Sequence, residues 1–177
     1  MSSTAVPAID PAFGLWHRLF MRNAFATCIV LSLLVGGVAW AQQQVPYWVS
    51  VSASQARMRT GPGRNFPATW LYQRPGLPLR VIETFPAWRK VVDPDGTQGW
   101  MQANLLSERR TAMLRGETRA LRAAPDADAK IMWRAEPGVI GTIERCDSGW
   151  CVLDVGGRRG FVEAAALWGV GASEVVD

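Results

Sequence analysis

The chain has 177 residues, a formal net charge of +4 and 49% hydrophobic residues, among them nine tryptophans. Basic and acidic residues are interspersed, without the basic run or aromatic-basic stripe that follows a nucleic-acid backbone, so we expect no nucleic-acid partner. The length admits one large domain or two small ones, and tryptophans that each bury about 150–250 Å² suit a small core.

The first 41 residues predict an export signal. Arg18 and Arg22 precede an apolar run over 24–38, and the run ends in Ala-Trp-Ala at 39–41. A basic flank, an apolar run and a small-x-small site form a secretory signal peptide, with cleavage expected after Ala41. The alternative is an uncleaved anchor, but the apolar segment is short against about 30 Å of hydrocarbon. We therefore expect a periplasmic or secreted protein with no membrane contact after cleavage.

Short strands are expected after the signal. Bulky and small residues alternate there with a period of two, which favours half-buried strands. Two glycines and two prolines make 60–67 a surface loop with Phe66 beneath it, and Asp-Gly at 95–96 marks a hairpin turn. Residues 102–106 fit a single helical turn. The expected strands are 47–52, 57–59, 68–73, 77–84, 88–92 and 97–101.

The remaining chain repeats this order. A short strand is expected within the linker 107–118, and Gly-Gly at 156–157 replaces Asp-Gly as the hairpin turn. We place one domain at 42–107, a second at 108–170 and a frayed tail at 171–177. Short strands with tight turns and no helical periodicity predict an all-β fold of two tandem small barrels or sandwiches. The matching landmarks, each 61 to 63 positions apart, are Arg59 and Arg122, Trp70 and Trp133, Pro75 and Pro137, Trp88 and Trp150, Gly99 and Gly160, and Leu106 and Leu167.

The first unit resembles the bacterial SH3-like (SH3b) domains over nearly its whole length. The second unit departs at its first loop, and it has Phe161 where the first has Trp100. The resemblance implies a small five-stranded barrel used for recognition, since many relatives bind peptidoglycan, often its peptide, and others bind proteins. Fold alone does not settle the ligand. The marks of the resemblance are Arg-x-Gly-Pro-Gly at 59–63, Pro-Gly at 75–76, Trp88 with Val91, Gly-Trp at 99–100 and a closing Leu106.

We do not expect an enzyme. The only histidine, His17, lies in the signal, which removes Ser-His, Cys-His and His-ligated zinc sites from the exported chain. A glycosidase would need two carboxylates in one cleft, and no pair of acidic residues is favoured. No catalytic residue, no metal and no cofactor are therefore predicted.

Cys146 and Cys151 are the thiols that remain after the signal, because Cys28 lies within it. A loop around Ser148-Gly149 would bring the two cysteines together, and an oxidising compartment favours a disulfide between them. The loop-entropy model gives about 2 kcal/mol of stabilisation for such a short loop. A redox-active pair is the alternative, but the Cys-x-x-Cys spacing is missing.

The candidate ligand-binding residues lie in the first unit, which keeps the glycine-rich loop. Arginines flanking that loop suit peptide carboxylates, although an ordinary solvated surface remains the alternative. The family resemblance implies that aromatic residues beside the loop line the ligand groove. The expected partner is a peptidoglycan peptide or an envelope protein, with the second unit as a brace. The candidates are Arg57, Arg59, Arg64, Tyr72 and Trp88. Alternation places Trp70, Trp100, Trp133 and Phe161 in the core, and Tyr72 shares the parity of Trp70. The core remains the alternative place for Trp88 and for Trp150.

Overall fold

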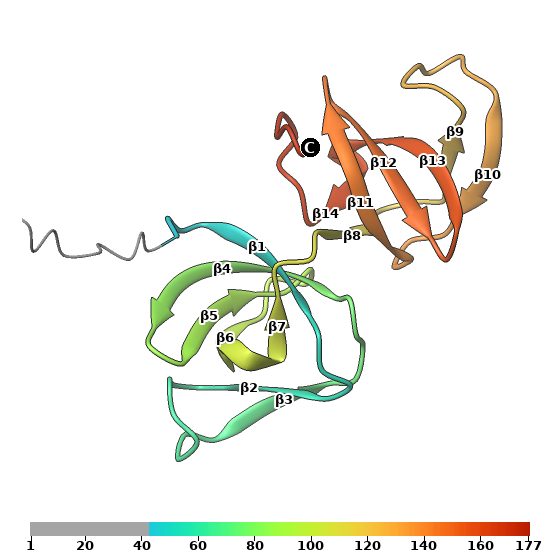
Figure 1. The fold of residues 1–177 in the computed structure, drawn as a ribbon. Coiled ribbons are helices and arrows are strands. Elements are labelled where there is room, and N and C mark those ends of the chain that lie inside the picture. The colour runs from blue at the N-terminus through green and yellow to red at the C-terminus, as the bar shows by residue number, and fades with distance from the viewer. Residues whose placement is uncertain (1–42) are drawn as a thin grey trace, which may run out of the picture. The chain divides into compact units, whose positions relative to one another are not determined.

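The computed structural model describes residues 43–177, and the regular elements of this part of the chain are β-strands and two 3₁₀ turns, without an α-helix. Two antiparallel sheets follow one another along the chain, and Figure 1 shows each sheet curled about its own interior. The predicted signal peptide and its cleavage site lie outside the described residues. No helix within 43–177 is long and apolar enough to span a bilayer. The all-β tandem arrangement predicted from the sequence is therefore confirmed.

The first barrel contains seven strands in the spatial order β3-β2-β6-β5-β4-β1-β7. Each predicted strand is present within two residues of its expected ends, and the predicted helical turn is a 3₁₀ turn. The strand missed by the sequence reading is the two-residue β7, which pairs with β1. The elements are β1 (Tyr47–Val51), β2 (Ala56–Arg59), β3 (Ala68–Tyr72), β4 (Pro78–Phe85), β5 (Trp88–Val92), β6 (Gln98–Gln102), the 3₁₀ turn Ala103–Leu105 and β7 (Leu106–Ser107).

The second barrel has the same strand order, β10-β9-β13-β12-β11-β8-β14. The strand expected in the linker is β8, which opens this barrel and pairs with β11 and β14. The linker therefore contains little free chain. The elements are β8 (Thr111–Leu114), β9 (Arg119–Arg122), β10 (Ile131–Ala135), β11 (Ile140–Asp147), β12 (Trp150–Val155), β13 (Arg158–Glu163), the 3₁₀ turn Ala164–Ala166 and β14 (Leu167–Trp168).

The repeat extends to the hydrogen-bonded register of the strands. Met58 faces Trp70 across β2 and β3, and Leu121 faces Trp133 across β9 and β10. The register shift beside Met58 recurs at the matching place in the second barrel, as does the shift between β4 and β5. Such bulges bend and twist a strand pair. The two barrels therefore share the same local curvature, and their residues can be compared position by position.

Each barrel has its own apolar core. The alternating strand positions supply it, as expected for sheets with one face buried. The second core includes the disulfide between Cys146 and Cys151, with an S–S distance of 2.01 Å, which confirms the predicted pair. The fully buried members include Met58, Leu79, Val81, Val91 and Met101 in the first barrel and Leu114, Leu121 and Leu153 in the second.

The barrels are joined by side-chain contacts around Trp168. The indole N–H of Trp168 donates to the Pro78 carbonyl at 3.0 Å, and its ring meets Trp48 edge to face at 5.1 Å between centroids. The Thr111 hydroxyl donates to the Gly76 carbonyl at 2.8 Å. Met113 and Ile140 also pack against the first core. The junction is thus apolar with satisfied polar groups, rather than a flexible tether.

The predicted fraying of the C-terminal tail is wrong. Val176 exchanges two backbone hydrogen bonds with Cys146, at 2.9 and 3.0 Å, and Glu174 forms an ion pair with Arg110 at 2.7 Å. Strand β8 covers only the first residues of β11, so the far part of β11 leaves backbone groups for the tail to pair with. The tail therefore continues the sheet at that edge.

Candidate functional site

The outer face of the first sheet gathers the side chains that can meet a ligand. Neighbouring residues in a strand point to opposite faces, so Lys90 and Trp100 point away from the core that contains Val91 and Met101. The rings of Phe85 and Trp100 meet edge to face at 6.5 Å. Pairing across β4, β5, β6 and β2 aligns one row of Glu83, Lys90, Trp100 and Arg59, and a second row of Phe85, Trp88 and Gln102.

Trp88 is not the exposed aromatic residue that was expected. Its side chain is 7% exposed, because it lies between Phe85 and Gln102 on adjacent strands and is covered on this face. A buried indole leaves almost no surface for a ligand, so its assignment to the ligand-binding set is corrected. Phe85, which is 52% exposed, is the aromatic residue that reaches solvent in this row.

The aromatic residues that were expected in the core differ from one another in how far they are buried. Trp70 is 58% exposed, because β3 is the edge strand of its sheet and extends past the core residues. Trp133, at the matching position, is half-buried and is held by a hydrogen bond to the Arg159 carbonyl and by the guanidinium of Arg158. Trp100 is buried as expected, although it lies on the outer face. Trp70 is therefore exposed to solvent, although the alternation of residues in the sequence predicted that it lies in the core.

Phe161 and Trp150 are the corresponding aromatic residues of the second barrel. Phe161 was expected in the core, but it is half-buried, and the guanidinium of Arg145 lies 5.5 Å from its ring centroid. Trp150, whose place the sequence left open, is also half-buried and lines a cavity. Both side chains therefore belong to the outer layer of their barrel.

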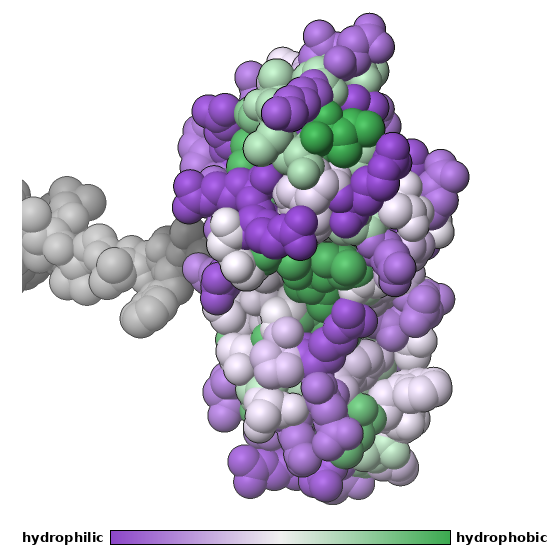
Figure 2. All heavy atoms as spheres, turned by 90° about the vertical axis from the view of Figure 1, so that its right-hand side faces the viewer, coloured by the Kyte–Doolittle hydropathy of each residue, from purple (hydrophilic) through white to green (hydrophobic). Residues whose placement is uncertain are grey.

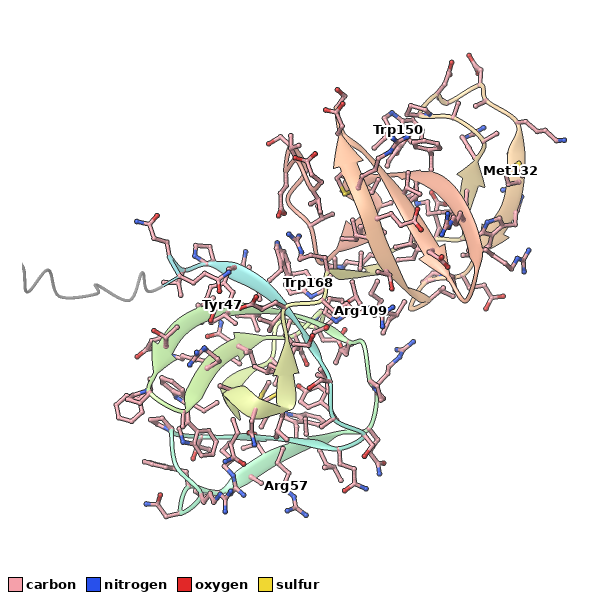
Figure 3. All side chains as sticks on the ribbon, viewed as in Figure 1. Tyr47, Arg57, Arg109, Met132, Trp150 and Trp168 are labelled. Atoms are coloured by element: carbon pink, nitrogen blue, oxygen red, sulfur yellow. A yellow bond between two sulfur atoms is a disulfide. The ribbon has the colours of Figure 1, made fainter. Side chains whose placement is uncertain are left out.

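A cavity of about 160 Å³ opens on the outer face of the first barrel. Figure 3 shows Arg57 on the first barrel. Arg57 and Leu71 are paired in register between β2 and β3, so they project to the same side. The Arg57 side chain is exposed and has no hydrogen bond or ion pair to any residue of 43–177, whereas Leu71 offers an exposed apolar side chain beside it. The cavity lining consists of Gln55, Arg57, Arg59, Leu71, Gln102 and Leu105.

Arg59 lines the same cavity but also holds the first loop. One guanidinium nitrogen donates to the Phe66 carbonyl at 2.6 Å. Arg122, its counterpart, donates to the Ala129 carbonyl at 2.7 Å. Because both copies keep this bond, the main contribution of Arg59 is to the shape of the loop.

The other two candidates lie away from the cavity. Arg64 is exposed in the first loop, without a partner in the described part of the chain. Tyr72 packs against the first core, and its hydroxyl donates to Asp93 at 2.8 Å. Burial, together with the neighbouring Asp93 carboxylate, raises the pKa of Tyr72 above its ordinary range. Arg57 and Arg59 thus line one cavity, whereas Arg64, Tyr72 and Trp88 are not among its lining residues.

The first loops of the two barrels have the same backbone hydrogen bonds, although only one contains Gly-Pro-Gly. Thr60 donates to the Pro67 carbonyl, and Ala123 donates to that of Lys130. The glycines instead make room for an aromatic ring, because a Cβ on Gly61 would lie 2.4 Å from the Phe66 ring. Phe66 therefore packs against the loop, as predicted, but the glycine-rich sequence does not give the first loop a different backbone.

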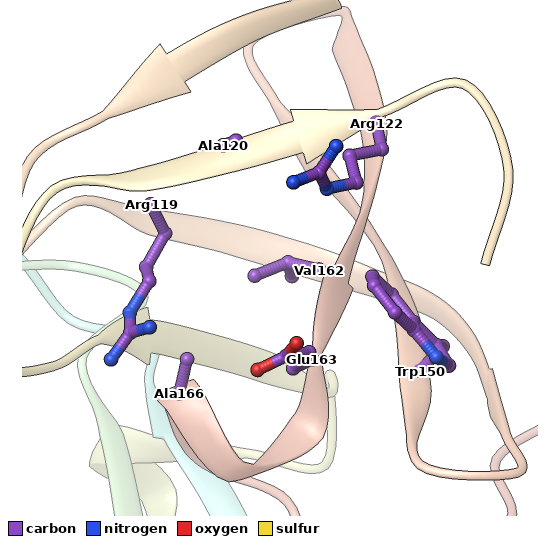
Figure 4. A pocket seen from close by; sticks show the side chains of 7 residues that line it. All are labelled: Arg119, Ala120, Arg122, Trp150, Val162, Glu163 and Ala166. Carbon is purple, nitrogen blue, oxygen red and sulfur yellow. The ribbon is translucent and has the colours of Figure 1, made fainter. Parts of the chain in front are cut away.

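The second barrel has a cavity of about 90 Å³ at the matching position. Arg122 and Glu163 correspond to Arg59 and Gln102 of the first cavity, and Ala166 corresponds to Leu105. Figure 4 shows two guanidinium groups and one carboxylate around this space, with an indole at one end. The lining residues are Arg119, Ala120, Arg122, Trp150, Val162, Glu163 and Ala166.

One face of the molecule is largely polar. Figure 2 shows hydrophilic side chains over most of one face, with small separate hydrophobic areas between them. Large continuous apolar patches mark stable protein interfaces, and none appears on that face. Within 43–177, no group of three His, Cys, Asp or Glu side chains could hold a metal ion.

Comparison with known proteins identifies the family of this chain. No significant match is found among curated proteins. The solved structures that are similar include NlpC1 and NlpC2 from Trichomonas vaginalis, with TM-scores of 0.32 and 0.34 and identities of 13% and 11%. Those matches cover 73% and 70% of this chain, which spans about half, 48%, of each of those proteins. The family model described as "Bacterial SH3 domain" matches residues 52–108 and 115–169, and the chain therefore belongs to the bacterial SH3 domain family.

Proposed function

We propose that this protein is an exported, non-enzymatic binding protein whose first barrel recognises a peptide of the cell wall. The observation that carries the proposal is the unpartnered guanidinium of Arg57 beside Leu71 in the first cavity, within a bacterial SH3 domain. A guanidinium can bind a carboxylate through two parallel hydrogen bonds, a geometry that lysine cannot reproduce.

The cavity suits a short peptide with a free carboxylate. Leu71 and Leu105 provide apolar contacts for small side chains, and the Gln102 amide can both donate to and accept from a peptide backbone. The stem peptide of peptidoglycan supplies all three features, since it combines free carboxylates, small side chains and peptide groups. A carboxylate that binds Arg57 there places its neighbouring atoms against the two leucines.

The chemistry of the described residues supports a binding role without catalysis. Residues 43–177 contain no histidine, and their two cysteines form the disulfide. A nucleophile activated by a histidine base therefore has no counterpart in this part of the chain.

Retention on purified peptidoglycan sacculi tests the proposal. Arg57→Ala is the informative variant, because the second barrel has Ala120 at the matching position and the fold accepts alanine there. Loss of a charge-assisted hydrogen bond costs about 1.5–3 kcal/mol, which is roughly a 10- to 100-fold loss of affinity. Arg134→Ala is the matched control, since Arg134 is an exposed strand arginine without a partner in 43–177. Equal retention of both variants would contradict the proposal.

Export is tested separately by N-terminal sequencing. Protein recovered from the envelope fraction of cells that express the full chain is expected to begin at Gln42. An intact N-terminus on that protein would instead support the uncleaved anchor.

A second candidate function is an interaction module for envelope proteins. The exposed Trp70 and Leu71 on the edge strand β3 favour it, because aromatic residues contribute strongly to protein interfaces. A photo-crosslinking residue in place of Trp70 distinguishes the two candidates in cells. A discrete protein adduct supports this module, whereas crosslinking to muropeptides alone supports cell-wall recognition.

A further inference from the structure

The second barrel repeats the first cavity with a different set of charges. Arg59 is retained as Arg122, but the neutral Gln102 is replaced by Glu163. The free Arg57 is replaced by Ala120, and a cation returns one position earlier as Arg119, where the first barrel has Ala56. The second cavity therefore has two guanidinium groups and one carboxylate, against two guanidinium groups alone in the first.

These charges do not neutralise one another. The Glu163 side chain is exposed and its carboxylate forms no ion pair or hydrogen bond with any residue of 43–177. Arg119 pairs only with Glu117, at 3.5 Å, and that glutamate side chain is 78% exposed, so the pair is weak. The Nε–H of Arg119 is covered and has no acceptor in the described part of the chain. Both signs of charge thus remain available around one small space.

The cavity is also the right size for a small group. Its volume is about 90 Å³, against about 160 Å³ for the first cavity. The half-buried indole of Trp150 closes one end, and an aromatic face attracts an ammonium group. A carboxylate fits the guanidinium groups, and an ammonium fits Glu163 and the indole.

We propose that the second barrel has a binding site of its own for a zwitterionic group, with an ammonium and a carboxylate on the same carbon. The α-centre of a free amino acid, or of an amino acid held through its side chain, has this chemistry. The site goes beyond the proposed function, because it needs no contribution from the first cavity. Ligand recognition is thereby assigned to the second barrel, for which only a structural role was expected from the sequence.

Nuclear magnetic resonance with three probes tests the site on protein purified from cells that express the full chain. Alanine has both charges, N-acetylalanine has only the carboxylate and alaninamide has only the ammonium. We expect alanine to shift the amide signals of Ala120 and Ala166 and the indole signal of Trp150 saturably. The two blocked probes should bind at least about tenfold more weakly, as expected when one charged hydrogen bond is lost.

Glu163→Gln gives the cavity the residue type of the first barrel and is expected to fold. It should lower alanine binding about tenfold and leave N-acetylalanine binding unchanged, because only the ammonium partner is removed. Glu136→Gln, at an exposed position outside the cavity, is the matched control. Equal midpoints for the three probes, or no saturable shift with alanine, would overturn the inference.

Sacculus retention of the same proteins separates the two proposals. A protein that binds alanine at the second cavity but is not retained on sacculi refutes the proposed function alone. A protein that is retained but shows no alanine-dependent shift at Ala120, Trp150 and Ala166 refutes the second site alone.

Discussion

The packing of Phe66 against the first loop predicts an energetic coupling between two positions. A Cβ on Gly61 would lie 2.4 to 2.7 Å from three atoms along one edge of the Phe66 ring, namely Cγ, Cδ1 and Cε1. Gly61→Ala therefore forces the ring outward. Overpacking costs about 1–3 kcal/mol, and we expect the lower end because Phe66 is 39% exposed and can move into solvent. Phe66→Ala alone loses the buried part of the ring, roughly 1–2 kcal/mol.

The double variant resembles the second barrel, where Ala124 and Ala129 occupy the two positions. When position 66 is alanine, the methyl group of alanine at position 61 has no ring to clash with. The double variant should therefore be no less stable than Phe66→Ala. The expected coupling energy is therefore about 1 kcal/mol, measured by urea denaturation of the wild type, both single variants and the double variant. Additive losses of stability would refute this account of the loop.

Two further predictions concern the second barrel. Replacing Cys146 and Cys151 by alanine should lower the free energy of unfolding by about 2 kcal/mol in the loop-entropy model, and an unchanged denaturation midpoint would show that the disulfide contributes nothing. The C-terminal tail should loosen in acid. Burial raises the pKa of Glu174, but hydrogen bonds from Arg110 and from the Gly171 N–H have the larger effect and hold this pKa below its usual 4.5. The stabilisation is then complete above the unfolded-state pKa near 4.5 and is lost as the pH falls through the lower folded-state pKa. The protection factor of the Val176 amide in hydrogen exchange should fall over that range, with Glu174→Gln as the variant in which this pH dependence disappears.

Local pattern in the sequence was enough to predict the strands and the disulfide. Alternation along 57–59 reflects burial on one face, since Met58 is buried between the more exposed Arg57 and Arg59, and a strand carries this property in its own residues. The four residues between Cys146 and Cys151 that make the hairpin are also local. Features that are determined within one strand or one turn can therefore be predicted from the sequence without knowledge of the remaining fold.

The errors arose where a residue's surroundings depend on other strands. Trp70 alternates like a core residue, but β3 is an edge strand, and strand order is not visible in the alternation. Trp88 is buried by neighbours on β4 and β6. The tail appeared unstructured because its partner, the free edge of β11, exists only in the folded sheet.

The candidate site shows the same limit. Arg57 was identified from its place beside the glycine-rich loop, and it does line the first cavity. The second cavity was missed because its charges come from Arg119 and Glu163, which are more than forty residues apart in the sequence. Only the repeated register shows that Glu163 occupies the place of Gln102.

Calorimetric titration with soluble stem peptides tests the central claim most directly. The purified protein is titrated with a peptide that has its free carboxylates and with the same peptide after amidation. The account predicts that the wild type binds the free form at least about tenfold more tightly, and that Arg57→Ala removes this preference while Arg134→Ala retains it. Equal affinity of the wild type for both peptides would contradict the account.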